Sequence, residues 1–273
     1  MTTIALEALD LAALLCSRVC HDVISPVGAI VNGLEVLDEE KDPEMRTFAL
    51  DLIKKSATMA SAKLQFCRLA FGAAGSAGAS IDTGDAETVT RGLFGDDKIK
   101  LDWRAPRILM PKNKVKLILN LCLIAAGTIP RGGTMTVDVE GQGDEAAVRI
   151  VAKGNYARVP AGIGALLAGA PEHGTIDAHA IQPFFTGLVA REVGMVATVR
   201  SEPEGIVIEG RPVVVETALH QDADAAQPDD GQQDAAQPDA AQPDAADVAM
   251  GLADQMRAAA ADDLAPASRV AAA

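Results

Sequence analysis

Two runs of apolar residues at helical spacing fill the N-terminal quarter of the chain and limit what it can fold into. Members of the first run lie three or four positions apart and therefore share one narrow face of a helix. They are Leu15, Val19, Val23, Pro26, Ile30, Leu34 and Leu37. A second run covers residues 45–71, and before it Asp42 and Pro43 suit the N-cap and first turn of a new helix. The sequence predicts an antiparallel helical hairpin over residues 1–74.

The two predicted helices carry more apolar surface than one hairpin can bury. Helices that pair only with each other leave part of each apolar face in water, whereas four helices enclose a common core. Because most soluble oligomers are symmetric assemblies of one chain, a second copy is the expected source of the missing pair. We therefore expect a homodimer in which two hairpins form a four-helix bundle.

The pattern changes after residues 72–80, which are rich in Gly, Ala and Ser and have the composition of a linker. Short β-branched runs then alternate with helical segments, and a short helix is expected after Asp85. Strands are predicted at residues 99–103, 134–140, 146–152, 195–200, 205–209 and 212–215, and helices at residues 111–127, 162–167 and 180–193. Residues 81–218 are therefore expected to form an α+β two-layer sandwich.

Residues 219–273 differ from the rest in composition. The pentapeptide Ala-Ala-Gln-Pro-Asp occurs three times, and the segment holds 11 aspartates but only two arginines. Such a segment buries too little apolar surface to offset the entropy lost on ordering. It is predicted to be a disordered acidic tail.

Charge and composition disfavour several classes of function. The net charge is −14, aromatic residues make up 3% of the chain, and no basic stripe is present, so nucleic-acid binding is not expected. No apolar run reaches the roughly 20 residues of a membrane span, and the N-terminus lacks the pattern of a secretory signal. The four cysteines suit a reducing compartment. We expect a cytoplasmic protein without membrane contact.

A histidine stands on the polar side of the first predicted helix, in the string His21-Asp22-Val23-Ile24-Ser25-Pro26. At about 100° per residue its side chain points away from the apolar face, and its outward neighbours, Ser17 and Gly28, are small. The plain interpretation of an isolated helical histidine is a solvated surface residue. The neighbouring Asp22 favours a chemical role for His21, because it can orient the ring or accept a proton from one nitrogen and leave the other as a nucleophile.

A metal site at the same place is an alternative. Cys16 and Cys20 are one helical turn apart, so their thiols share a helix face, but His21 faces a different side and zinc needs further ligands. We therefore expect both cysteines to serve packing. The other histidines are placed in loops or at helix ends and are expected to have no chemical role: His173, His179 and His220.

The string around His21 resembles the phosphoacceptor box of sensor histidine kinases, and later segments resemble the ATP site of that family without its ligands. Asn120 matches the start of the first ATP-site helix, whereas Ile124 stands at the magnesium-holding position. Ala152 stands where the family has its adenine-binding aspartate, and residues 183–188 join the Pro-Phe-Phe and Gly-Leu boxes with no lid between them. The resemblance implies a degenerate histidine-kinase ATPase-like domain that has lost ATP binding.

The whole of residues 5–216 resembles the dimeric histidine phosphotransferases of the ChpT type, known from alphaproteobacteria. The resemblance implies that His21 accepts a phosphoryl group from the receiver domain of a hybrid histidine kinase and passes it to response regulators, including regulators of the cell cycle. Asp22 would be the acidic neighbour that orients the ring, and Arg18 would contact the phosphoryl oxygens. The receiver would dock on Ser17, Ile24, Ser25 and Gly28. No cofactor or metal is expected in the chain itself, because the receiver supplies Mg²⁺.

Two other functions remain open for this sequence. An ATP-dependent kinase with an unusual site would label itself when given ATP alone. A non-catalytic scaffold or binding module for two-component proteins would engage its partner without using His21.

Overall fold

The computed structural model describes residues 6–72, 78–95, 98–141, 145–171 and 175–213. These residues belong to one compact unit, Met1–Thr217, which contains both the predicted hairpin and the predicted sandwich. The predicted tail at residues 219–273 and the middle of the predicted linker lie outside the described residues.

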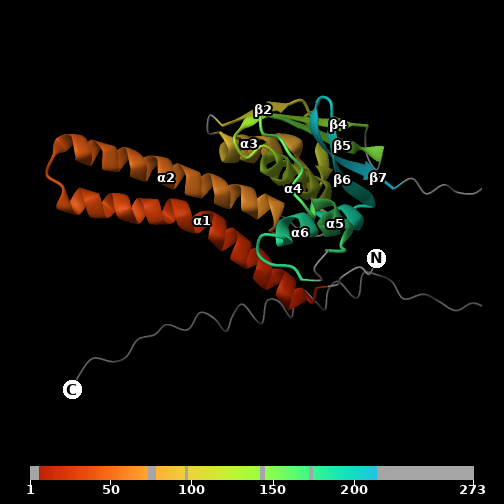
Figure 1. Ribbon diagram of the computed structural model, residues 1–273, viewed down its shortest axis with the longest axis horizontal. Helices are drawn as coiled ribbons and strands as arrows, with labels where there is room; N and C mark the ends of the chain where they lie inside the picture. The colour runs from red at the N-terminus through yellow and green to blue at the C-terminus, as the bar shows by residue number, and fades with distance from the viewer. Residues whose placement is uncertain (1–5, 73–77, 96–97, 142–144, 172–174, 214–273) are drawn as a thin grey trace, which may run out of the picture. The chain divides into compact units, whose positions relative to one another are not determined.

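Two long helices form the N-terminal hairpin, α1 (Ala8–Glu39) and α2 (Pro43–Ala70) (Figure 1). The turn between them is built as the sequence predicts: the Asp42 carboxylate accepts a 3.1 Å hydrogen bond from the Glu44 N–H, and Pro43 takes the first helical position. Arg46 of α2 reaches back to the carbonyl oxygens of Leu37 and Glu40 at the end of α1. The hairpin prediction is confirmed.

Small residues line the contact between α1 and α2. The buried positions include Pro26 and Gly33 on α1 and Ala49, Ser56 and Ala60 on α2. A Cβ atom on Gly33 would lie 2.6 Å from the Ile53 side chain, so the two helices approach closely at this point. The hairpin is therefore held by close packing of small groups rather than by large interlocking side chains.

Large apolar side chains of the hairpin point into solvent instead. Leu34, which the helical spacing assigns to the apolar face, is 49% exposed, and Phe48 is 65% exposed. Others of this kind are Ile24, Val27, Val31, Met45 and Leu64. Of the seven residues of the first apolar run only Leu34 is exposed, whereas Ile24, Val27 and Val31 lie outside that run, so one chain leaves an apolar strip beside the predicted face uncovered. The four-helix bundle is not part of a single chain.

The length and apolar composition of α1 would suit a helix that crosses a membrane. The helix of a bundle that buries one apolar face meets the same criteria. Here α1 packs along α2 and carries the Arg18–Asp22 ion pair in its middle.

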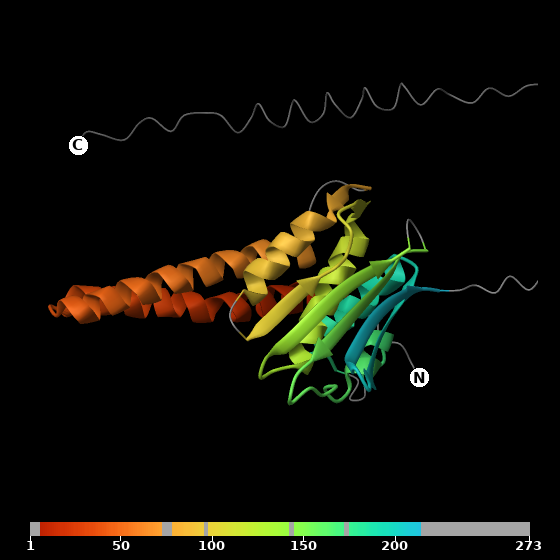
Figure 2. The same cartoon turned by 90° about the horizontal axis from the view of Figure 1, so that it is seen from above.

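A five-stranded mixed sheet forms the second part of the unit, in the order β2-β4-β5-β7-β6. Its strands are β2 (Ile99–Trp103), β4 (Gly133–Glu140), β5 (Ala147–Lys153), β6 (Met195–Glu202) and β7 (Gly205–Pro212). The pair β2–β4 is parallel and the other pairs are antiparallel. Helices α4 (Lys112–Thr128), α5 (Ile163–Ala168) and α6 (Ile181–Glu192) pack against the sheet (Figures 1 and 2). The predicted α+β sandwich is confirmed.

The core lies between these helices and the sheet. In α4, Leu117, Ile118 and Leu121 are fully buried, and alternate residues of β5, among them Ile150 and Ala152, face them. This alternation is what a strand with one buried face requires. Burial at about 25 cal/mol per Å² of apolar surface makes this layer the main source of stability in the unit.

Two short strands were not predicted, β1 (Ser80–Asp82) and β3 (Leu109–Pro111), which pair with each other. Three residues are too few to show a period of two, so nothing in the pattern distinguishes them from loop. Helix α3 (Thr83–Phe94) also begins earlier than expected, because the Asp82 carboxylate accepts a 2.7 Å hydrogen bond from the Gly84 N–H and caps it. Of the predicted strand at 212–215, Pro212 ends β7 and residues 214–215 lie outside the described residues.

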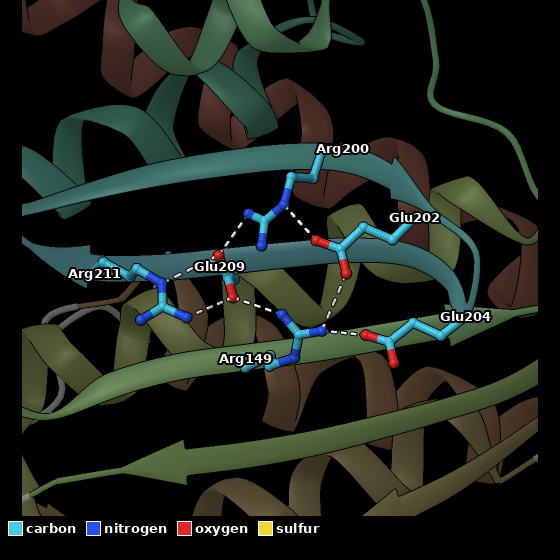
Figure 3. A network of polar contacts seen from close by, with 6 residues as sticks. All are labelled: Arg149, Arg200, Glu202, Glu204, Glu209 and Arg211. Atoms are coloured by element: carbon cyan, nitrogen blue, oxygen red, sulfur yellow. Dashed lines mark hydrogen bonds and ion pairs between the residues drawn. The ribbon is translucent and has the colours of Figure 1, made fainter.

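The other face of the sheet carries a polar network around Glu209 (Figure 3). This carboxylate is 2% exposed and accepts hydrogen bonds from Arg149, Arg200 and Arg211, which reach it from β5, β6 and β7. Arg211, together with Arg200 and Arg149, holds the pKa of Glu209 well below its usual value, although burial acts in the opposite direction. Figure 3 shows three arginines bound to one acid, so the network ties adjacent strands together.

Candidate functional site: His21 and its surroundings

His21 lies near the middle of α1 with 69% of its side chain exposed. Helical residues before and after it hold its backbone, while its ring stands outside the contact with α2. Such a ring is accessible to the active site of a partner protein.

Asp22 and Arg18 form a short chain of charges beside this ring. Asp22 Oδ1 lies 3.5 Å from His21 Nδ1, and Arg18 Nε donates a 2.9 Å hydrogen bond to Asp22 Oδ2. Arg18 and Asp22 are four residues apart, the spacing at which ion pairs form along a helix. A carboxylate beside Nδ1 favours the proton on that nitrogen and leaves Nε2 with a free lone pair. The predicted contact of Arg18 with phosphoryl oxygens stays a prediction, and in this structure Arg18 orients Asp22.

Lys63 of α2 completes the polar surroundings of Asp22. Its Nζ donates a 2.7 Å hydrogen bond to the backbone carbonyl of Asp22. Nearby, burial and the Asp22 carboxylate raise the pKa of the Cys67 thiol to about 11, against the opposing effect of Arg18 and Lys63. Cys67 is therefore a neutral packing residue beside the site. Sequence reasoning missed Lys63, although a helix-internal proline four residues after Asp22 marks that carbonyl as one without a helical donor.

The four predicted docking residues lie on accessible parts of α1. Ser17, Ile24 and Ser25 are exposed, and Gly28 is partly exposed, with no atom from outside its own stretch of helix backbone within 4 Å of the place where its Cβ would be. Their role in docking stays a prediction. The expectation that Cys16 and Cys20 serve packing is wrong for the single chain, because both are exposed. Within the described part of the chain, no group of three His, Cys, Asp or Glu side chains is arranged to hold a metal ion.

His179 meets His21, which sequence reasoning did not foresee. The two ring centroids are 5.7 Å apart and the ring planes are inclined by 77°, an edge-to-face arrangement. His179 precedes α6, in a turn where Asp177 accepts hydrogen bonds from the backbone N–H groups of His179 and Ala180. The two histidines are distant in sequence and come together only because α6 packs near α1. The α/β part therefore contributes a side chain to the surroundings of His21.

The positions that resemble a nucleotide site are occupied by packing and internal hydrogen bonds. Asn120 is fully buried, and its amide nitrogen donates to the carbonyl of Ala70 at the end of α2, at 2.9 Å. Gln182 of α6 donates to the carbonyl and side-chain oxygens of Asn120. Ile124 and Ala152 belong to the apolar core. Asn120 thus joins α2, α4 and α6.

The segment that would hold a nucleotide lid is an uninterrupted helix. Residues 183–188 lie inside α6, and a Cβ on Gly187 would stand 2.1 Å from the Leu167 carbonyl oxygen. Only glycine allows this approach of α6 to α5. The close contact of α6 with α5 leaves no gap between the two helices at Gly187.

Comparison with known proteins identifies the family. Residues 83–205 match the model of the histidine phosphotransferase C-terminal domain. The protein phosphotransferase ChpT of Brucella abortus (strain 2308) is 52% identical over 204 residues, which are 75% of this chain and 96% of that protein. This chain belongs to the ChpT family of histidine phosphotransferases. The resemblance found in the sequence is confirmed, and with it a function in phosphorelay.

One solved structure agrees with this assignment. The 1.7 Å structure of a bacterial phosphotransferase is 48% identical, covers 77% of this chain and 100% of its own, and superimposes with a TM-score of 0.71. The histidine kinase AdeS of Acinetobacter baumannii also matches, at 9% identity over 70% of this chain and 96% of its own, with a TM-score of 0.39.

Proposed function

We propose that this ChpT-family protein relays phosphoryl groups through His21, from the receiver domain of a hybrid histidine kinase to downstream response regulators, as a cytoplasmic homodimer. The observation that carries the proposal is an exposed imidazole whose Nδ1 faces Asp22 at 3.5 Å. That arrangement leaves Nε2 as a nucleophile open to a docked partner.

The transfer step needs little from the chain beyond position. Neutral Nε2 attacks the phosphorus of a receiver aspartyl phosphate in line, the N–P bond forms, and the P–O bond to the aspartate breaks to release its carboxylate. Positive charge that develops on the ring is stabilised through Nδ1–H by Asp22, which Arg18 holds in place. The receiver's own Mg²⁺ neutralises the phosphoryl oxygens. Transfer to a response regulator is the same step in reverse.

A basic groove supports docking of an acidic partner next to this site. It has a volume of about 890 Å³ and runs between the hairpin and α3, beside Ser25 and Pro26. Lys54, Lys55, Lys63 and Arg91 contribute cationic side chains to its lining. Positive side chains around a groove speed the approach of a negatively charged surface and fix its orientation.

The proposed homodimer rests on the uncovered apolar face of the hairpin. Exposed apolar patches larger than those of ordinary monomers mark interaction surfaces. Here Val27, Val31 and Leu34 on α1 and Met45 and Phe48 on α2 are more than one third exposed. A second hairpin supplies an apolar face of the same kind, which makes a four-helix bundle the proposed assembly.

The absence of kinase activity is part of the proposal. Ile124 stands in the core at the magnesium-holding position, and Asn120 is bound to Ala70 and Gln182. These side chains would have to leave their present partners to hold a metal or a nucleotide.

The test is transfer from a phosphorylated receiver domain to the purified protein and to its His21→Gln variant. We expect acid-labile label on the wild type and none on the variant, with a His173→Gln protein as matched control and normal labelling. With labelled ATP alone, neither protein should become labelled. Persistent label on the His21→Gln protein would overturn the assignment. A variant that still supports signalling in cells would favour a scaffold instead.

A further inference from the structure

One carbonyl oxygen of α1 lacks its helical donor directly beside the phosphoacceptor. In an α-helix the carbonyl of residue 22 accepts from the N–H of residue 26, but Pro26 has no N–H. The proline ring also crowds the carbonyl four residues earlier and turns it away from the helix axis. An unpaired carbonyl that faces a second helix costs desolvation free energy.

Lys63 provides the donor for this carbonyl from the other helix of the hairpin. Its Nζ lies 2.7 Å from the Asp22 carbonyl oxygen, across 41 residues of sequence, in a partly buried position. A hydrogen bond with a charged donor is roughly twice as strong as a neutral one. The bond therefore anchors the turn of α1 before Pro26 to α2.

We propose that Lys63 is a positioning residue for phosphoryl transfer: by binding the carbonyl that Pro26 leaves unpaired, it fixes the turn that carries His21 and Asp22. This inference rests on the proposed function of His21. The carbonyl and the carboxylate belong to the same residue, so movement of one displaces the other from His21 Nδ1. Small displacements of reacting groups lower transfer rates strongly.

A double-mutant cycle with Pro26 tests this link directly. Lys63→Met keeps the length of the side chain and removes the donor, and we expect it to lower the transfer rate at saturating phosphorylated receiver about tenfold. Pro26→Ala restores the backbone N–H of residue 26 and so gives the Asp22 carbonyl its helical partner. In that background the same Lys63→Met change should lower the rate less than about twofold.

Two further variants separate positioning from general charge effects. Lys63→Arg keeps a charged donor and should restore the rate to within about threefold of the wild type. Lys55→Met removes another cation from the same groove and should raise the receiver concentration at half-saturation without lowering the saturated rate. If the Lys63→Met protein melts at a lower temperature than the wild type, both transfer rates are measured at a temperature at which both proteins are folded.

Equal losses from Lys63→Met in both backgrounds, or no loss in either, overturn the proposal. A large loss only where Pro26 is present supports it. The proposed function fails separately, and recognisably, if no phosphorylated receiver labels the wild type at His21.

Discussion

The helical hairpin and the α/β part place their apolar residues in opposite ways. In α4, Leu117 and Leu121 are fully buried, whereas Ile24 and Phe48 of the hairpin are 69% and 65% exposed. The α/β part buries its large core side chains within one chain. The hairpin, which carries His21, the proposed phosphoacceptor, leaves large apolar side chains in solvent.

The two parts differ in their chemistry as well. In the hairpin, Arg18, Asp22 and Lys63 form the polar surroundings of His21. In the α/β part, Asn120 and Gln182 bind each other and the end of α2. The difference teaches that this chain separates reaction from stability. Substitutions in the hairpin should alter assembly and transfer, and substitutions in the α/β part should alter the free energy of unfolding.

The largest effect is expected from Phe48→Asp, which places a charge on the uncovered apolar face. Loss of an aromatic residue that is buried in an interface weakens association by about 2–4 kcal/mol. We expect sedimentation equilibrium to show a concentration-dependent dimer for the wild type and a monomer for the variant. Val196→Asp on β6, where the valine is also exposed, is the matched control and should leave the dimer intact. A monomeric wild type would contradict the proposed assembly.

A smaller effect, confined to stability, is expected from Glu209→Gln. The variant loses charge-assisted bonds to three arginines, and because those arginines are partly exposed to solvent we expect a loss of about 1–3 kcal/mol in the free energy of unfolding at pH 7. The pKa of Glu209 is lower in the folded protein than in the unfolded chain. Its contribution is therefore present above the unfolded pKa, near 4.3, and is lost as the pH falls toward the folded pKa.

Urea unfolding at several pH values measures this contribution. The difference between wild type and Glu209→Gln should shrink below about pH 4, and transfer to His21 should be unchanged at pH 7. Glu87→Gln, which removes a surface ion pair with Arg91, should change stability by less than about 1 kcal/mol. A slower transfer rate in the Glu209→Gln protein would contradict the expectation that substitutions in the α/β part alter stability and not transfer.

The sequence predicts the long periodic elements of both parts, but not their shortest strands. The long periods of α1 and α2, and the alternation in β5 and β6, were visible because burial repeats over many residues. The strands β1 and β3 were not, since three residues show no period. His21 and Asp22 were found because they are neighbours on one helix.

Contacts between distant segments could not be found in this way. Lys63 reaches the site from α2, so its place depends on how the two helices of the hairpin pack together. His179 reaches it from the turn before α6, so its place depends on how the hairpin packs on the rest of the unit. The exposure of Cys16 and Cys20 was mispredicted for a related reason: helical spacing tells which residues share a face, but not how many faces a partner covers.

The smallest effect is expected where the two parts meet, at His179. Its ring borders His21 edge to face at 5.7 Å, so we expect it to limit how the His21 ring can rotate. We expect His179→Ala to slow transfer from a saturating phosphorylated receiver about threefold, because the freed ring spends less time aligned. His179→Phe keeps an aromatic edge in place and should transfer at nearly the wild-type rate. If the alanine and wild-type proteins transfer equally fast, His179 does not affect transfer. The α/β part then only supports the hairpin, and the residues that govern transfer all lie in the hairpin.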